Sequence, residues 1–284
     1  MTEPVVPPSV AGTIGRVVAF FLLVVLCATV AVVFLSPPLT WLAVRAGQRL
    51  RIDYYAQLAG IAAATWIMLR GVDHRPWADV DLGEAAARPR LLAIGWLIGA
   101  AAIVVTCAVL YLAGLLAFLP TAMGSGWTGA AIRVTLVLLP AALAEEMASR
   151  GYLLTVLRER IGTRAAIAVT SVGFGLLHLA NPGWTFVSLS MVMFAGVLLA
   201  VVRVALRSIY AAWMAHLAWN WVMAVPLHAY VSGQRLEAPG YRAVTEGPAW
   251  LSGGRWGPEG GLAAALGMTV VVAYFYARRR REES

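Results

Sequence analysis

Long uninterrupted apolar runs dominate the chain and leave little room for the alternation typical of strands. Eight such runs lie near residues 17–35, 53–70, 91–119, 128–157, 163–181, 184–206, 208–227 and 261–277. Most have about the 17–25 residues that a helix needs to cross a bilayer, and the third is long enough to tilt or to begin outside the hydrocarbon. The pattern predicts about eight transmembrane helices.

Composition agrees with this interpretation. Hydrophobic residues make up 61% of the 284 residues and charged residues only 13%, against about 25% charged in a typical soluble domain. We expect one transmembrane domain over 17–277, between a Pro-rich tail at 1–16 and a basic tail at 278–284. The first run exceeds the apolar core of a signal peptide, which has about 7–15 residues, so we expect it to be retained.

Every basic residue is an arginine, and the arginines fall unevenly between the two sets of loops. The side that holds both termini carries 14 of them and the opposite side carries 6. Because cytoplasmic loops are enriched in Lys and Arg, we expect a multi-pass protein of the cell membrane with both termini in the cytoplasm. The net charge of +8 follows from this bias, and no nucleic-acid partner is needed to explain it.

Two polar connectors stand out between the runs. Residues 71–90 are rich in acidic and basic side chains, and residues 228–260 form a long segment rich in Gly, Pro, Trp and Arg. Neither shows a clear periodicity, so we expect loops, with a short interfacial helix in the first.

Charged side chains interrupt the fourth apolar run. Glu145, Glu146 and Arg150 lie there, where an ionisable residue costs about 2.5–3.5 kcal/mol near the bilayer centre and usually serves a function. Glu146 and Arg150 are four positions apart, which predicts an ion pair on one helix face and leaves the Glu145 carboxylate free. The alternative is a structural charge network that locks helices together. Pro140 is expected to bend this helix by removing a backbone hydrogen bond.

Polar residues at the same spacing mark two later runs. Phe174 and His178 share one helix face, and His216 and Asn220 share another. Taken alone, each pair could join helices, because His and Asn often form hydrogen bonds between membrane helices.

Depth in the membrane distinguishes these possibilities. Counted from the arginine that flanks each run, Glu145, His178 and Asn220 lie 13 or 14 residues into their helices. At about 1.5 Å per residue they are roughly 20 Å deep, and His216 is roughly 14 Å deep. Because helices of alternating direction place these groups in one layer, we predict an all-α integral membrane protein whose helices surround a central polar cavity.

A carboxylate, two imidazoles and an amide suit hydrolysis by an activated water. Glu145, helped by His178, would take a proton from the water, and His216 with Asn220 would stabilise the oxyanion. We find no serine or cysteine nucleophile in this layer. The predicted reaction is hydrolysis of a peptide bond in a membrane-embedded or lipidated substrate.

The three spaced motifs resemble those of the CPBP family, which comprises the type II CAAX prenyl endopeptidases (Rce1-like) and the bacterial Abi proteins. The resemblance spans about residues 128–225 and rests on Glu145-Glu146-x-x-x-Arg150, Phe174-x-x-x-His178 and His216-x-x-x-Asn220. It implies an eight-helix intramembrane protease. The eukaryotic members of the family act on prenylated CAAX proteins.

The resemblance also implies roles for the motif residues. It assigns Glu145 and His178 to water activation, and His216 and Asn220 to the oxyanion site. The members with a supporting role are Glu146, Arg150 and Phe174.

Three alternatives stay open. Glu145, His178 and His216 could bind zinc and leave one open position, although the resemblance favours a metal-free mechanism, so we expect no cofactor. The chain could instead be a non-catalytic membrane protein for bacteriocin immunity or partner scaffolding. A transporter with a proton relay would predict broken helices and paired repeats, and the sequence indicates neither.

Overall fold

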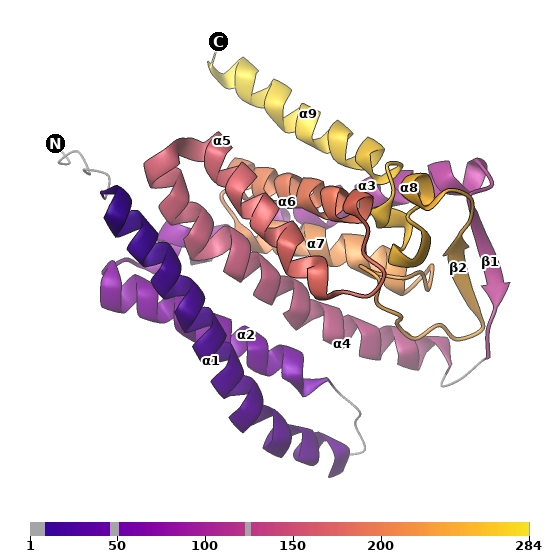
Figure 1. Cartoon of the computed structure of the whole chain (residues 1–284), viewed down its shortest axis with the longest axis horizontal. Coiled ribbons are helices and arrows are strands. Elements are labelled where there is room, and N and C mark those ends of the chain that lie inside the picture. The colour runs from indigo at the N-terminus through magenta and orange to yellow at the C-terminus, as the bar shows by residue number, and fades with distance from the viewer. Residues whose placement is uncertain (1–8, 46–50, 123–125, 284) are drawn as a thin grey trace.

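The computed structural model describes residues 9–45, 51–122 and 126–283. Two parts of the sequence analysis lie outside the described residues. They are the Pro-rich start of the expected tail, residues 1–8, and Arg49, one of the six arginines on the opposite side. Figure 1 shows a bundle in which the amino end of α1 and the carboxyl end of α9 lie at one end, and a small two-stranded sheet lies at the other.

The first half of the chain contributes three long helices. α1 (Val10–Arg45) begins inside the segment expected as a tail, and α2 (Ile52–Ile67) continues into a π-helical turn, Met68–Val72. Two 3₁₀ turns, Trp77–Val80 and Glu84–Ala86, follow in the first polar connector. They lead to α3 (Pro89–Leu112) and strand β1 (Leu116–Pro120).

The second half holds the expected site. α4 (Trp127–Glu146) runs through a π-helical turn (Met147–Gly151) into α5 (Tyr152–Leu177), and a 3₁₀ turn (His178–Ala180) ends that stretch. α6 (Phe186–Leu206) and α7 (Ile209–Ala224) follow, and the chain ends with α9 (Ala264–Glu283). Residues 278–283 of the expected basic tail therefore continue the last helix.

The predicted runs coincide with helices, and the chain is a helical membrane protein. Four helical stretches of the described residues are long and apolar enough to cross a membrane: α1, α3, the run from Trp127 to Ala180, and α6. Gly162 divides the third of these, because its φ of 77° is a left-handed conformation that glycine adopts without steric cost. Eight crossings stay a prediction.

One apolar run is not a single helix. The run predicted over 91–119 is helical only to Leu112, because Gly114 takes a positive φ of 69° just beyond the helix end. The amide of Gly114 donates to Tyr111 O, and that of Leu115 donates to Leu110 O. This is the Schellman ending favoured by glycine. The remaining apolar residues form β1, which pairs antiparallel with β2 (Tyr241–Thr245).

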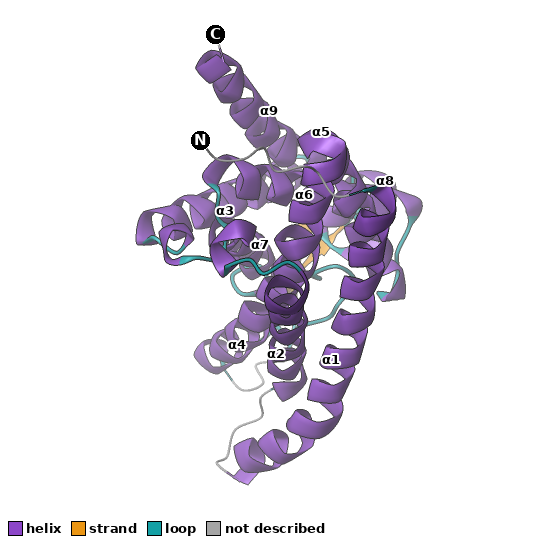
Figure 2. Ribbon diagram, turned by 90° about the vertical axis from the view of Figure 1, so that its left-hand side faces the viewer, coloured by secondary structure: helices purple, strands orange, loops and turns teal. Residues whose placement is uncertain are grey.

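α7 lies inside the bundle, where it contacts α3, α4 and α6. Most of the α7 side chains are buried. The sequence of α7 therefore lacks the polar face of a helix that is exposed on one side. α1 is the opposite case: it packs on α2 at the edge of the bundle (Figure 2). Its apolar side chains are largely exposed, as expected for contact with lipid.

α4 continues through Pro140, where a bend was expected. Proline has no N–H, so the carbonyl four residues earlier loses its helical partner. That carbonyl, Leu136 O, accepts a hydrogen bond from the Tyr55 hydroxyl of α2 at 2.7 Å. A neighbouring helix therefore compensates for the proline.

The segment expected as a loop over 228–260 is folded. We call residues 225–263 the cap. It contains β2, the short helix α8 (Ala249–Ser252) and two 3₁₀ turns, Gly254–Trp256 and Pro258–Gly260. The cap lies at the sheet end of the bundle in Figure 1, beside the carboxyl ends of α5 and α7.

Candidate active site

A buried charge group joins α4 to α7. Glu146 and Arg150 have no exposed side-chain surface, and Arg150 Nη1 lies 3.0 Å from Glu146 Oε1. The same oxygen is 2.9 Å from His216 Nδ1. Because an ionised carboxylate only accepts hydrogen bonds, Nδ1–H of His216 is the donor. The predicted Glu146–Arg150 pair is present, and the imidazole is a third member that helix spacing did not indicate.

Phe174 connects this group to the second histidine. The guanidinium carbon of Arg150 lies 4.0 Å from the centre of the Phe174 ring, which is a cation–π contact. The ring centres of His178 and His216 lie 4.8 Å and 6.0 Å from that of Phe174, both edge to face. Phe174 therefore holds both imidazoles in one cluster, from its place on α5.

Glu145 reaches the cluster through His216. Its Oε2 lies 3.9 Å from His216 Nε2, too far for a direct hydrogen bond. That oxygen is buried without a hydrogen-bond partner among the described residues, while the side chain as a whole is 43% exposed. Glu145 is thus the one carboxylate of the motif that is both near an imidazole and accessible.

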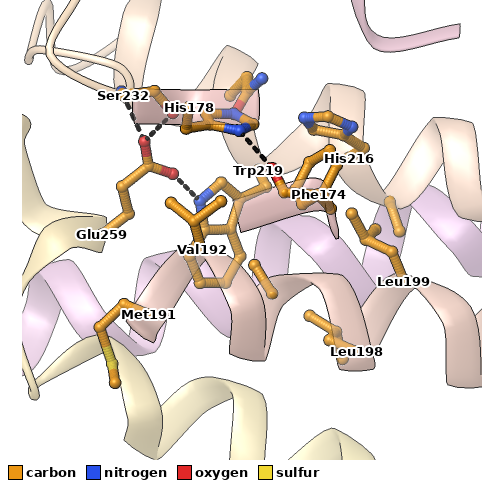
Figure 3. A pocket seen from close by; sticks show the side chains of 13 residues that line it. Phe174, His178, Met191, Val192, Leu198, Leu199, His216, Trp219, Ser232 and Glu259 are labelled. Carbon is orange, nitrogen blue, oxygen red and sulfur yellow. Dashed lines mark hydrogen bonds between the residues drawn. The ribbon is translucent and has the colours of Figure 1, made fainter. Parts of the chain in front are cut away.

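His178 and His216 face a pocket together with Asn220 (Figure 3). His178 Nδ1 is 2.9 Å from Phe174 O. A carbonyl oxygen only accepts, so Nδ1 of His178 carries a proton and donates it to this bond. Glu145 is not among the residues that line this pocket.

The rest of the pocket wall comes from α6 and the cap. The α6 side is apolar and consists of Met191, Val192, Ala195, Leu198 and Leu199. The cap side is polar and consists of Ser232 and Glu259. A substrate in this pocket would have an apolar wall on one side and hydrogen-bonding groups on the other.

Glu259 and Ser232 were not predicted from the sequence. Both lie in the segment expected as a loop, which has no helical or alternating pattern to place its side chains. The one available signal was an acidic residue within Gly257-Pro258-Glu259-Gly260-Gly261, and that pattern does not indicate what the residue contacts.

The ligand set considered for zinc is not assembled as a metal site. Within the described part of the chain, no three His, Cys, Asp or Glu side chains are grouped as a metal ion would require. His216 Nδ1 is also bonded to Glu146, which leaves only Nε2 for a metal. Binding zinc through Glu145, His178 and His216 would require these side chains to move.

The site therefore combines a helical membrane bundle, a buried group of Glu146, Arg150 and His216, and a pocket lined by two histidines. Residues 126–222 match the family described as type II CAAX prenyl endopeptidase Rce1-like. The match covers α4 to α7 and all three motifs, and it confirms the resemblance. No curated protein and no solved structure matched the chain. The matched segment ends before the cap, so the cap residues of the pocket lie outside it.

Proposed function

We propose that the chain is an intramembrane endopeptidase that hydrolyses a peptide bond of a membrane-associated or lipidated peptide. The main support is that His178, His216 and Asn220 line one pocket while the Glu145 carboxylate lies 3.9 Å from His216 Nε2, within the segment that matches a family of prenyl endopeptidases. A multi-pass arrangement with both termini in the cytoplasm is part of this proposal.

In the proposed reaction, Glu145 accepts a proton from water, and the lone pair on His178 Nε2 orients that water. The hydroxide attacks the carbonyl carbon of the peptide bond. Glu145 then returns the proton to the leaving amine as the C–N bond breaks, so one group acts as base and acid in turn.

His216 and Asn220 would stabilise the oxyanion. An imidazolium that gives Nδ1–H to Glu146 still has Nε2–H to donate, and the Asn220 amide supplies a second donor. Preorganised donors of this kind are among the largest contributions to catalysis of acyl transfer. In this proposal Glu146, Arg150 and Phe174 orient the ring of His216.

Replacing Glu145 by glutamine tests the proposal. Purified wild-type protein, Glu145→Gln and the exposed control Glu246→Gln are incubated with membrane proteins from the host, and new C-termini are identified by mass spectrometry. We expect Glu145→Gln to lose activity by at least about 100-fold, as for removal of a general base, and the control to retain it. Equal cleavage by all three proteins would contradict the proposal. Retention of a bacteriocin-immunity or partner function by Glu145→Gln would support a non-catalytic role.

Chelation separates the metal-free mechanism from the zinc-dependent one. We expect 1,10-phenanthroline to leave cleavage unchanged, as its non-chelating isomer 1,7-phenanthroline should. Full loss of cleavage that added zinc restores would show that Glu145, His178 and His216 act as ligands instead.

A further inference from the structure

Glu259 has more hydrogen bonds than any other group that lines the pocket. Trp219 Nε1 donates to its Oε2 at 2.6 Å. The backbone N–H and the hydroxyl of Ser232 donate to Oε1 at 2.6 Å and 2.8 Å. Figure 3 shows these bonds on one side of the pocket. Glu259 as a whole is 8% exposed, and bonds to an ionised group are about twice as strong as those between neutral groups.

These three bonds join parts of the chain that are far apart in sequence. Trp219 belongs to α7 and directly precedes Asn220, the proposed oxyanion donor. Ser232 belongs to the cap, and its carbonyl accepts a hydrogen bond from the Asn181 side chain, just after the turn that carries His178. Glu259 therefore links the cap to α7, and Ser232 links the cap to the segment that follows α5, around one pocket.

Apolar contact holds the cap at a second place. Trp256 is fully buried and packs with Phe174 and Val192. Its ring centre lies 6.4 Å from that of His178. This packing places the cap over the pocket but does not involve α7. The hydrogen bond from Trp219 to Glu259 joins the turn of α7 that carries Asn220 to the cap.

We propose that Glu259 is a positioning residue of the active site: it fastens the cap to α7 and keeps the Asn220 amide directed into the pocket. The part concerning Asn220 rests on the proposed function. Glutamine at position 259 keeps the shape of the side chain but has one acceptor oxygen. Its amide nitrogen would face either the indole N–H or the Ser232 donors, so at least one bond is lost.

Hydrogen–deuterium exchange tests the fastening without a substrate. Wild type, Glu259→Gln, the milder Trp219→Phe and the control Glu246→Gln are compared in detergent. Glu246 lies in the same cap but is exposed. We expect Glu259→Gln to speed exchange over residues 225–263 and the last turn of α7 by about tenfold, as for loss of a charged hydrogen bond. Trp219→Phe should give a smaller change in the same direction, and the control none.

A double-mutant cycle with Asn220→Ala tests the positioning. We expect Glu259→Gln to lower kcat by at least about tenfold with a smaller effect on KM, since small displacements of catalytic groups are costly. In the Asn220→Ala background the same change should lower kcat by less than about twofold, because the two residues act as a unit. A merely structural role would give equal reductions in both backgrounds.

Each outcome decides a part of the proposal. Unchanged exchange in Glu259→Gln overturns the fastening role. Faster exchange with equal reductions of kcat in both backgrounds overturns positioning through Asn220. Equal cleavage by wild type and Glu145→Gln would overturn the proposed function together with the positioning role, and the exchange result would still decide whether Glu259 holds the cap.

Discussion

Arg150 contacts three different helices at the candidate site. It is fully buried, pairs with Glu146, donates from Nη2 to Gly196 O at 3.3 Å and lies over the Phe174 ring. Those contacts connect α4 to α6 and α5. Burying an ion pair costs free energy, but removing one partner of a buried pair costs far more. The local structure therefore depends on the intact Glu146–Arg150 pair.

Replacing Arg150 by glutamine should therefore destabilise the protein. The change leaves the Glu146 carboxylate buried without its cation, and splitting a buried pair costs about 3–5 kcal/mol. Thermal unfolding in detergent would measure the loss. The double variant Glu146→Gln, Arg150→Gln removes both charges and should recover part of the stability. A single variant as stable as wild type would contradict a structural role for the pair.

At the scale of elements, the placement of His216 depends on how closely α3 approaches α7. A Cβ built on Gly95 would lie 2.1 Å from Ala211 O, and one on Gly99 would lie 1.9 Å from Ala215 O. No side chain fits in this space, so the two helices meet backbone to backbone, as small residues permit in membranes. Ala215 lines the pocket directly before His216.

Gly99→Ala should accordingly push α7 away from α3 and move His216. We expect reduced thermal stability by about 1–3 kcal/mol, as for overpacking, together with reduced cleavage. Gly15→Ala is the matched control, because Gly15 is also helical and nothing lies within 4 Å of its Cβ position. The control should be neutral or slightly more stable, since alanine is the better helix former. Equal behaviour of the two variants would contradict the close approach.

At the scale of the whole molecule, the two ends of the bundle differ in chemistry. The bend of α5 and the carboxyl end of α9 lie at one end, and the β1–β2 sheet and the cap lie at the other (Figure 1). Arg160 lies on α5 just before its kink, and Arg207 directly follows α6. From the positive-inside rule we propose that the cap lies on the side of the membrane away from the cytoplasm.

Labelling of single cysteines tests this orientation. Arg160, on α5 before its kink, and Glu246, directly after β2, are both exposed. In intact cells an impermeant maleimide should label Glu246→Cys, and it should label Arg160→Cys only after the membrane is permeabilised. Cys27 and Cys107 are replaced by alanine in both variants. The reverse labelling pattern would place the termini outside the cytoplasm.

Features based on local spacing were predictable from the sequence. The apolar runs coincide with helices, and the division at Gly162 falls between two predicted runs. The Glu146–Arg150 pair follows from residues four apart on one helix, because neighbouring turns bring them together whatever surrounds them. The family match over 126–222 agrees with the three motifs.

Contacts between distant segments were decided only by the tertiary structure. The bond between Glu146 and His216 joins residues 70 positions apart, and the cap brings Glu259 to Trp219 across 40 positions. The cap has no periodic pattern, and a chain without periodicity gives no indication of which side chains turn inward. Hydrophobic length and spacing thus determined the helices and the Glu146–Arg150 pair, whereas packing determined which carboxylate meets which histidine and what covers the pocket.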